Sequence, residues 1–173
     1  MVIRRLTKDD ASSFWELRFK ALREDGDAFG ATYEEEVSKP LDNLIVRFNN
    51  EYIEAKEDNF ILGAFNEENK MIGVIGLHRE RRIKLRHKAT IWGMYVSKEY
   101  RKKMFGKLLL FEALNIAKSM EGLEQLNLCV VSSNIKAKNL YESMNFETYA
   151  IEKNAIKFDN KYFDEEYMVY FVK

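Results

Sequence analysis

Cysteine, proline and long apolar runs are scarce in this 173-residue sequence, which holds one cysteine and one proline. The lone Cys129 excludes an internal disulfide, and no Cys-x-x-Cys or His/Cys cluster offers the ligand spacing of a metal site. No apolar run approaches the roughly 18 residues of a membrane helix, and charge begins at Arg4. We therefore expect a cytoplasmic protein with no metal and no membrane partner.

Net charge is also absent, because 28 basic residues balance 28 acidic ones. No overall field draws the chain to nucleic acid, so an anion site must be local. One basic stretch keeps a nucleic-acid binder open as an alternative, but it lacks interleaved aromatic residues and is more typical of a solvated hairpin. Its members are Arg79, Arg81, Arg82, Lys84, Arg86 and Lys88.

Hydrophobic periodicity predicts the order β-α-α-β-β-β-α-β-α-β-β. This order indicates one domain over residues 1–173, in the α/β (α+β) class, with helices packed on a mixed sheet. Cys129, inside the apolar run Leu126–Val131, is expected to be a small buried side chain rather than a nucleophile. The expected strands are 2–6, 60–65, 71–77, 91–96, 126–131, 146–151 and 167–172, and the helices are 10–24, 40–56, 105–120 and a segment after Asn134.

The stretch Ile91–Met120 passes from a strand into a long amphipathic helix. A helix start carries free backbone N–H groups and partial positive charge, which suit phosphate. Four cations at this junction oppose the helix dipole, so either they are a solvated surface or they serve a bound polyphosphate. They are Arg101, Lys102, Lys103 and Lys107. The helix face expected to be buried consists of Phe105, Leu108, Leu109, Ala113, Ile116, Ala117 and Met120.

Two motifs on these elements resemble the GNAT superfamily of acyl-CoA-dependent N-acetyltransferases. The first is Val96, Tyr100, Arg101 and Gly106; the second is Asn134, Ala137, Leu140, Tyr141, Asn145 and Phe146. The resemblance implies a mostly antiparallel central sheet of about seven strands, with helices on both faces and a splay between the fourth and fifth strands. Gly93 is then either the bulge that starts the splay or a plain packing glycine.

The resemblance also implies acetyl-CoA as co-substrate and no metal. The pyrophosphate would meet the backbone of Arg101, Lys102, Lys103, Met104, Phe105 and Gly106, with Lys107 close by. The pantetheine arm would lie along Met94, Tyr95 and Val96. Asn134 would cap its helix, hold the coenzyme arm, or do both.

Met104 departs from the family pattern, because the resemblance expects glycine at this position of the loop. If the position needs a positive φ, methionine costs about 1–2 kcal/mol; in an ordinary helix it costs almost nothing. The sequence alone leaves both alternatives open.

The implied reaction is direct attack of a primary amine on the thioester. Tyr141 matches the family's proton donor to the departing thiolate, although a tyrosine in a core stripe is often only packing. Strand 89–96 carries no carboxylate, so His78 and Glu80 are the nearest candidates for a base.

Phe29 and Tyr33 are the candidate walls of the acceptor pocket, and Glu34, Glu35 and Glu36 either attract a cation or face solvent. The acceptor would be a small-molecule amine, an amino acid or a peptide amine, and a homodimer is possible. The missing strand carboxylate and Met104 motivate a second reading, a noncatalytic acyl-CoA-binding module.

Overall fold

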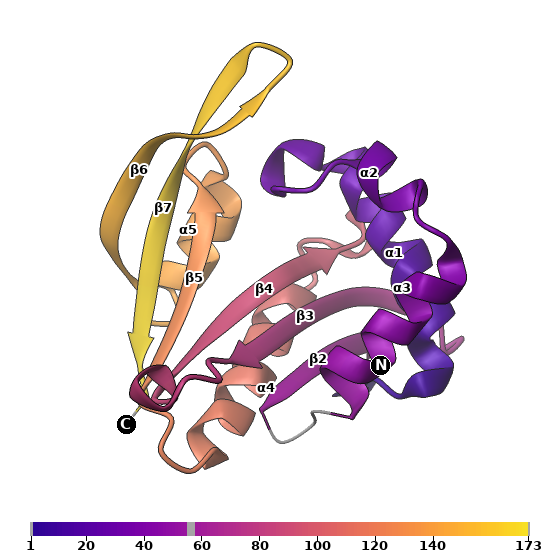
Figure 1. Cartoon of the computed structure of the whole chain (residues 1–173), viewed down its shortest axis with the longest axis horizontal. Coiled ribbons are helices and arrows are strands. Elements are labelled where there is room, and N and C mark those ends of the chain that lie inside the picture. Colours follow the sequence, from indigo (N-terminus) through magenta and orange to yellow (C-terminus); the bar gives the residue numbers. More distant parts are fainter. Residues whose placement is uncertain (1, 55–57, 173) are drawn as a thin grey trace.

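The computed structural model describes residues 2–54 and 58–172, which form a seven-stranded sheet with helices on both faces (Figure 1). The strands are β1 (Val2–Arg5), β2 (Asn59–Phe65), β3 (Met71–Arg79), β4 (Lys88–Val96), β5 (Gln125–Val131), β6 (Glu147–Phe158) and β7 (Lys161–Phe171). The helices are α1 (Ala11–Glu24), α2 (Tyr33–Val37), α3 (Leu41–Phe48), α4 (Phe105–Ser119) and α5 (Ile135–Glu142).

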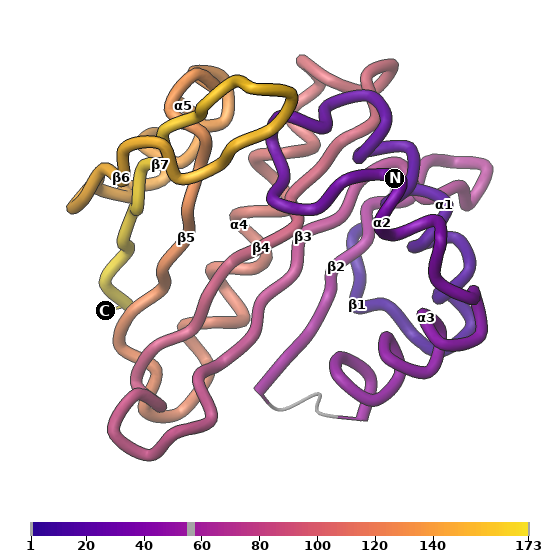
Figure 2. Tube along the Cα trace, turned by 45° about the horizontal axis from the view of Figure 1, so that its top comes forward, coloured from indigo at the N-terminus to yellow at the C-terminus, as the bar shows by residue number. Residues whose placement is uncertain are grey.

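The strands lie in the order β1-β2-β3-β4-β5-β7-β6. All neighbouring pairs are antiparallel except β4 and β5, which run parallel. The trace in Figure 2 shows that α4, a crossover helix, connects this parallel pair, as parallel strands require. The predicted mixed, mostly antiparallel sheet is therefore confirmed.

Two hydrophobic cores flank the sheet. On one face, α4 and α5 bury residues such as Leu109 and Ala113 against it. On the other face, α1 and α3 bury Phe14 and Phe48. The predicted inward face of α5 is confirmed, because its members all belong to or pack against the first core; they are Ala137, Leu140, Tyr141 and Met144.

The predicted buried face of α4 is wrong at one position. Leu108 is exposed, whereas Leu110 and Leu114 are buried. Three consecutive leucines fit two apolar stripes about 100° apart, and periodicity does not choose between them. Packing on the sheet selects the buried stripe, because the side of α4 that carries Leu110 faces the strands.

The largest differences from the predicted elements are an additional helix, the end of α3 and the length of the last two strands. The segment expected to be a loop before Pro40 contains α2, which Thr32 caps by accepting a hydrogen bond from the N–H of Glu35. α3 ends at Phe48 and continues as a π-helical turn, Asn49–Ile53, while the expected end near Lys56 lies outside the described residues. The last two strands form one long hairpin whose tip projects beyond the sheet (Figure 1). Most side chains of β6 are exposed, so the sequence lacks the alternation of apolar residues that would have predicted the full length of this strand.

Cys129 is exposed, so the expectation that it is buried is wrong. In β5 the alternate positions Leu126, Leu128 and Val130 are buried in the core on one face, and a strand alternates its side chains between faces, which turns Cys129 away from that core. Desolvation by its neighbours, and then the carboxylate of Glu165, raise the pKa of its thiol to about 11. The thiol is therefore protonated at neutral pH.

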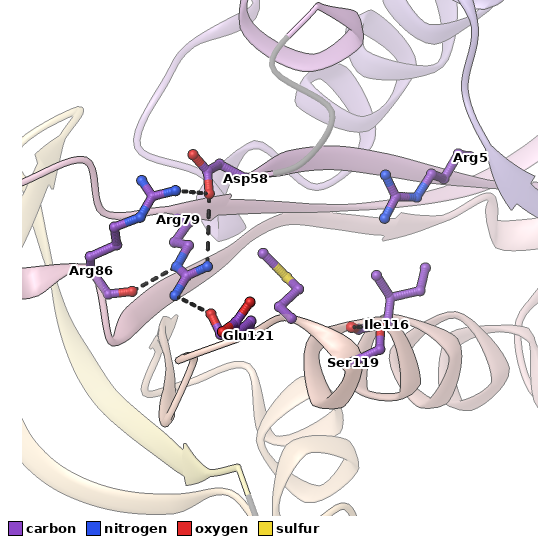
Figure 3. Close-up of a pocket in the computed structure, with 8 residues that line it drawn as sticks. Arg5, Asp58, Arg79, Arg86, Ile116, Ser119 and Glu121 are labelled. Atoms are coloured by element: carbon purple, nitrogen blue, oxygen red, sulfur yellow. Dashed lines mark hydrogen bonds and ion pairs between the residues drawn. The ribbon is translucent and has the colours of Figure 1, made fainter.

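Arg79, expected in a solvated connection, is a buried clamp between three segments (Figure 3). Its Nε donates to the carbonyl of Arg86 at 2.6 Å, and its Nη2 donates to the carbonyl of Glu121 at 2.8 Å. Asp58 lies 3.8 Å from its Nη1 and also pairs with Arg86. The clamp borders a cavity of about 800 Å³ at the C-terminal end of α4. Arg79 is thus held inside the protein, and Arg86 is tied to Asp58 at the surface.

Replacing Arg79 with methionine is expected to lower the free energy of unfolding by about 3 kcal/mol. The change leaves two carbonyls without their donor, and each buried unpaired group costs about 1–3 kcal/mol. Urea unfolding measures the effect. The control is Arg82→Met, an exposed arginine of the same connection, for which a change within about 0.5 kcal/mol is expected. Equal stability of the two variants would show that the clamp contributes nothing.

Candidate active site

β4 and β5 separate halfway along their length (Figure 1). They pair only at Lys88 with Gln125, Ala89 with Leu126 and Thr90 with Asn127. Beyond these pairs, the edge of β4 that faces β5 has no strand partner in the described part of the chain. The predicted splay between the fourth and fifth strands is therefore confirmed.

Gly93 forms the bulge at the start of the splay. Against β3 the register shifts there, because Val74 pairs with Tyr95 while Gly76 pairs with Trp92. Gly93 has a φ of +62°, and a Cβ placed on it would meet no atom within 4 Å. Packing therefore does not require glycine at this position, whereas backbone conformation does.

A Gly93→Val variant is expected to lose about 1–2 kcal/mol of stability, because a β-branched residue resists a positive φ. Gly93→Asn, which tolerates that region better, is expected to lose less than half as much. Urea unfolding of both variants provides the test. Equal losses would indicate that side-chain volume, and not φ, limits this position.

Met104 is the N-cap of α4 and adopts the left-handed conformation, with a φ of +66°. The costlier of the two alternatives for Met104 is thus the one that the fold adopts. Its side chain is 60% exposed and accepts no capping hydrogen bond. Lys102 also has a positive φ, of +62°. The loop is therefore a tight turn whose side chains point outward.

The start of α4 leaves backbone donors free. The N–H of Leu108 bonds to the carbonyl of Met104 at 3.0 Å, and this is the first such bond of the helix within the described chain. The N–H groups of Phe105, Gly106 and Lys107 precede it and point out of the helix end. Free donors at a helix start suit an anion, and these three N–H groups are called the anion seat below.

Arg101 is turned away from this seat. Its Nε donates to the carbonyl of Val96 at 2.8 Å, its guanidinium pairs with Asp25 after α1, and it lies 5.5 Å from the ring centre of Tyr95. Its charge therefore ties the end of β4 to α1. The cations that remain exposed around the helix start are Lys102, Lys103 and Lys107.

Gly106 brings the start of α4 close to β4. A Cβ on Gly106 would lie 3.2 Å from Cε of Met94, which packs with Val96 on the α4 face of the sheet. Tyr95 faces the other way and donates to Glu24 at 2.8 Å, and burial, then Glu24, raise its pKa. The splayed edge of β4 therefore leads directly to the anion seat.

Tyr141 lies on α5, beside the splay-forming strand β5. It is 7% exposed and stacks edge-on against Phe146 at 5.8 Å. Its hydroxyl has no hydrogen-bond partner within residues 2–54 and 58–172. Burial, and then Cys129, raise its pKa, so the hydroxyl keeps its proton at neutral pH. Asn134 caps α5 by accepting from the N–H of Ala137 at 3.2 Å, as expected.

The predicted acceptor walls lie on the opposite face of the sheet, between α1 and α2. Phe29 follows the turn Gly26–Ala28, which lies against β5. Tyr33 begins α2, accepts a hydrogen bond from Arg23 and stacks on Phe19 at 6.2 Å. Both aromatic residues are half-buried. They therefore border the side of the sheet toward which Tyr95 points.

The three glutamates of α2 differ from one another. Glu34 and Glu35 are exposed, but Glu36 is buried, with Lys39 at 2.9 Å and Arg47 at 3.9 Å. Neither expected alternative, a cation trap or a wet face, describes Glu36. It is the internal partner of two basic residues.

The base candidates lie at the start of the splay. Trp92 covers Gly76, and His78, two residues further along β3, shares that face of the sheet. His78 Nε2 is 3.9 Å from a carboxylate oxygen of Glu80. Its role as the base stays a prediction.

Sequence interpretation passed over Arg18. It lies on α1 four residues after Phe14 and three before Ala21, so it occupies the helix's apolar stripe. The sequence signal that could have identified Arg18 is a positively charged residue at the helical spacing of buried apolar residues.

No helix among the described residues is long and apolar enough to cross a membrane. The described part of the chain also holds no group of three or more His, Cys, Asp or Glu side chains arranged for a metal ion.

Known structures share this fold over their full length. A GNAT-family acetyltransferase of Streptococcus pneumoniae is 21% identical, with 99% of each chain covered and a TM-score of 0.85. A GNAT superfamily phosphinothricin acetyltransferase of Sinorhizobium meliloti, solved in complex with acetyl-CoA, is 20% identical, with coverage of 99% and 88% and a TM-score of 0.82. A putative acetyltransferase of Salmonella typhimurium, with its cofactor acetyl-CoA, is 17% identical, with coverage of 100% and 94% and a TM-score of 0.84.

No curated protein sequence matches the chain. The sequence model described as the acetyltransferase (GNAT) family, however, matches residues 13–146. This range includes the splay, the anion seat and Tyr141, and it spans most of the chain. The protein is therefore a member of the GNAT family of acetyltransferases.

Proposed function

We propose that the protein transfers an acetyl group from acetyl-CoA to a primary amine by direct attack of the amine on the thioester. The observation that carries this proposal is the continuity of the open β4 edge with the free N–H groups of α4. A long ligand with an amide-rich arm and a diphosphate suits such a surface, because it needs a strand partner at one end and donors at the other.

The residues present fit this ligand. The unpaired edge offers the backbones of Met94, Tyr95 and Val96 to the arm, and the helix start offers those of Phe105 and Gly106 to the diphosphate. The Met104 side chain is mostly exposed and leaves the donors uncovered. Three exposed lysines around the loop supply positive charge, and Asn134 keeps its amide N–H₂ available while its oxygen caps α5.

In the reaction, the amine nitrogen bonds to the acetyl carbon and the carbon–sulfur bond breaks. Tyr141 supplies a proton to the sulfur, and its raised pKa keeps the hydroxyl protonated for this task. The amine must first lose a proton. With a pKa near 10.4, only about one part in two thousand is neutral at pH 7, a penalty of ~4.6 kcal/mol. We assign the removal of this proton to His78 or to a water chain on the Trp92 face.

The noncatalytic alternative, an acyl-CoA-binding module, keeps its motivation in the strained Met104 and in the lack of a carboxylate on β4. Release of free thiol from acetyl-CoA separates the two functions. We expect amine-dependent release with at least one member of a panel of amines, amino acids, polyamines and peptides. Calorimetric binding of coenzyme A without release across the panel would support the binding module instead.

A further inference from the structure

Three buried donors on the face of the sheet that carries Phe29 have no partner. They are Nη1 of Arg18 and the indole Nε1 atoms of Trp15 and Trp92, and none finds an acceptor among the described residues. Buried N–H groups are nearly always paired, and an unpaired one destabilises the fold, most of all when it is charged. Several such groups on one face, one of them charged, indicate that another molecule supplies an acceptor.

Arg18 and Trp92 belong to one row of side chains on this face. Arg18 Cζ lies 4.6 Å from the ring centre of Phe29, the predicted acceptor wall. Burial and Glu51 raise the pKa of Tyr52, and the charges of Arg47 and Arg18 oppose that rise, which places Arg18 within electrostatic reach of Tyr52. Tyr52 in turn stacks on Trp92 at 5.0 Å. Phe29, Tyr52 and Trp92 all pack against the same core.

Two carboxylates lie near this row. Glu36 pairs through Oε1 with Lys39, and its Oε2 lies 3.9 Å from Arg47 without accepting a hydrogen bond among the described residues. Glu51 hydrogen-bonds to Tyr52. Arg18 has no ion pair within 4 Å in the described chain. Burial lowers its pKa, and the more distant Glu36 only partly opposes this effect. The row is thus a basic, partly buried surface, and its cation Arg18 has no carboxylate within 4 Å among the described residues.

We infer that the acceptor carries a carboxylate beside its amine, as an α-amino acid does, and that Arg18 binds this carboxylate while Trp92 Nε1 donates to an acceptor atom of the same molecule. The inference rests on the proposed function, since it names the acceptor of that transfer. A guanidinium fork matches the two oxygens of a carboxylate. Trp92 immediately precedes the Gly93 bulge, so the carboxylate site adjoins the start of the splay. A polyamine would bring a second cation against Arg18.

The test compares each α-amino acid with its primary amide and its decarboxylated amine. We expect kcat/KM for the amino acid to exceed that for the other two forms by at least about 30-fold. Arg18→Met is expected to remove this preference, lowering the value for the amino acid alone, and Arg18→Lys to restore part of it. Arg47→Met removes an equal charge that already has a partner, and is expected to keep the preference within about threefold.

Two further measurements separate recognition from structure and from catalysis. Arg18→Met should not lower the urea midpoint, because it removes an unpaired buried cation; a marked decrease would indicate a structural residue. Calorimetry on the coenzyme-A-saturated enzyme should detect the amino acids, and the heat should vanish in Arg18→Met.

The outcomes distinguish the two proposals. Equal rates with acids, amides and amines, unchanged in Arg18→Met, would overturn the carboxylate site and leave acetyl transfer standing. Heat from amino acids without thiol release would support the site while the proposed reaction fails. If no amino acid gives binding heat and none is preferred over its amide or amine, the inference is overturned.

Discussion

Replacing Tyr141 with phenylalanine is expected to lower kcat for acetyl transfer by about 10²–10³-fold, the range typical of a lost general acid. The KM for acetyl-CoA should change less than about threefold, since the hydroxyl is assigned to the departing sulfur and not to coenzyme binding. Stopped assays of thiol release at saturating acetyl-CoA measure the effect. Stability should be almost unchanged, because the hydroxyl has no hydrogen bond to lose within the described chain.

Tyr170→Phe is the matched control. Tyr170 packs against the same core and stacks on the same Phe146 ring at 5.5 Å, so both variants remove one hydroxyl from one aromatic cluster. We expect Tyr170→Phe to retain activity within about twofold. A Tyr141→Phe enzyme with parental kcat would assign Tyr141 to packing alone.

A triple variant that replaces Lys102, Lys103 and Lys107 with glutamine is expected to bind coenzyme A about 10–100-fold more weakly. Each exposed charge contact contributes up to about 1 kcal/mol, and a tenfold change corresponds to about 1.4 kcal/mol. The affinity for pantetheine, which lacks the diphosphate, should be unchanged. Calorimetry at two salt concentrations tests this, because the parental affinity should fall with salt more steeply than that of the variant.

The control removes the same number of charges from the β6–β7 hairpin, at Lys153, Lys157 and Lys161, which are exposed and distant along the chain. Its affinity for coenzyme A should match that of the parent. The ligand-free loop variant should be slightly more stable than the parent, since cations at a helix start oppose the dipole. Equal weakening by both triple variants would point to net charge and not to a local seat.

Local pattern predicted the strand-to-helix junction well, because a helix start and its free donors depend on neighbouring residues. The capping pair of Thr7 and Asp10 is local in the same way, with the N–H of Thr7 donating to Asp10 at 2.7 Å. The same local logic placed the bulge at Gly93 as one of two alternatives. It did not foresee that Arg101 turns back to Asp25, since that contact joins residues far apart in the chain.

Side chains with two possible faces were predicted least well. Leu108 and Leu110 fit equally good helical stripes, and Cys129 fits a buried strand read without its partners. In each case the choice depends on which surface the neighbouring element presents. Arg18 was passed over for a related reason, because only the assembled face shows that its guanidinium is enclosed and unpaired.

The sequence by itself determined the order of elements apart from the short helix α2, the mixed sheet and the donors at the start of α4, because each arises from periodicity or from helix ends. It left Gly93 as either a bulge or a packing glycine. Tertiary structure alone decided the left-handed state of Met104, the burial of Glu36 and the meeting of Arg18, Tyr52 and Trp92. Those features depend on packing between segments distant in the chain, and a linear pattern carries no information about which surfaces come together.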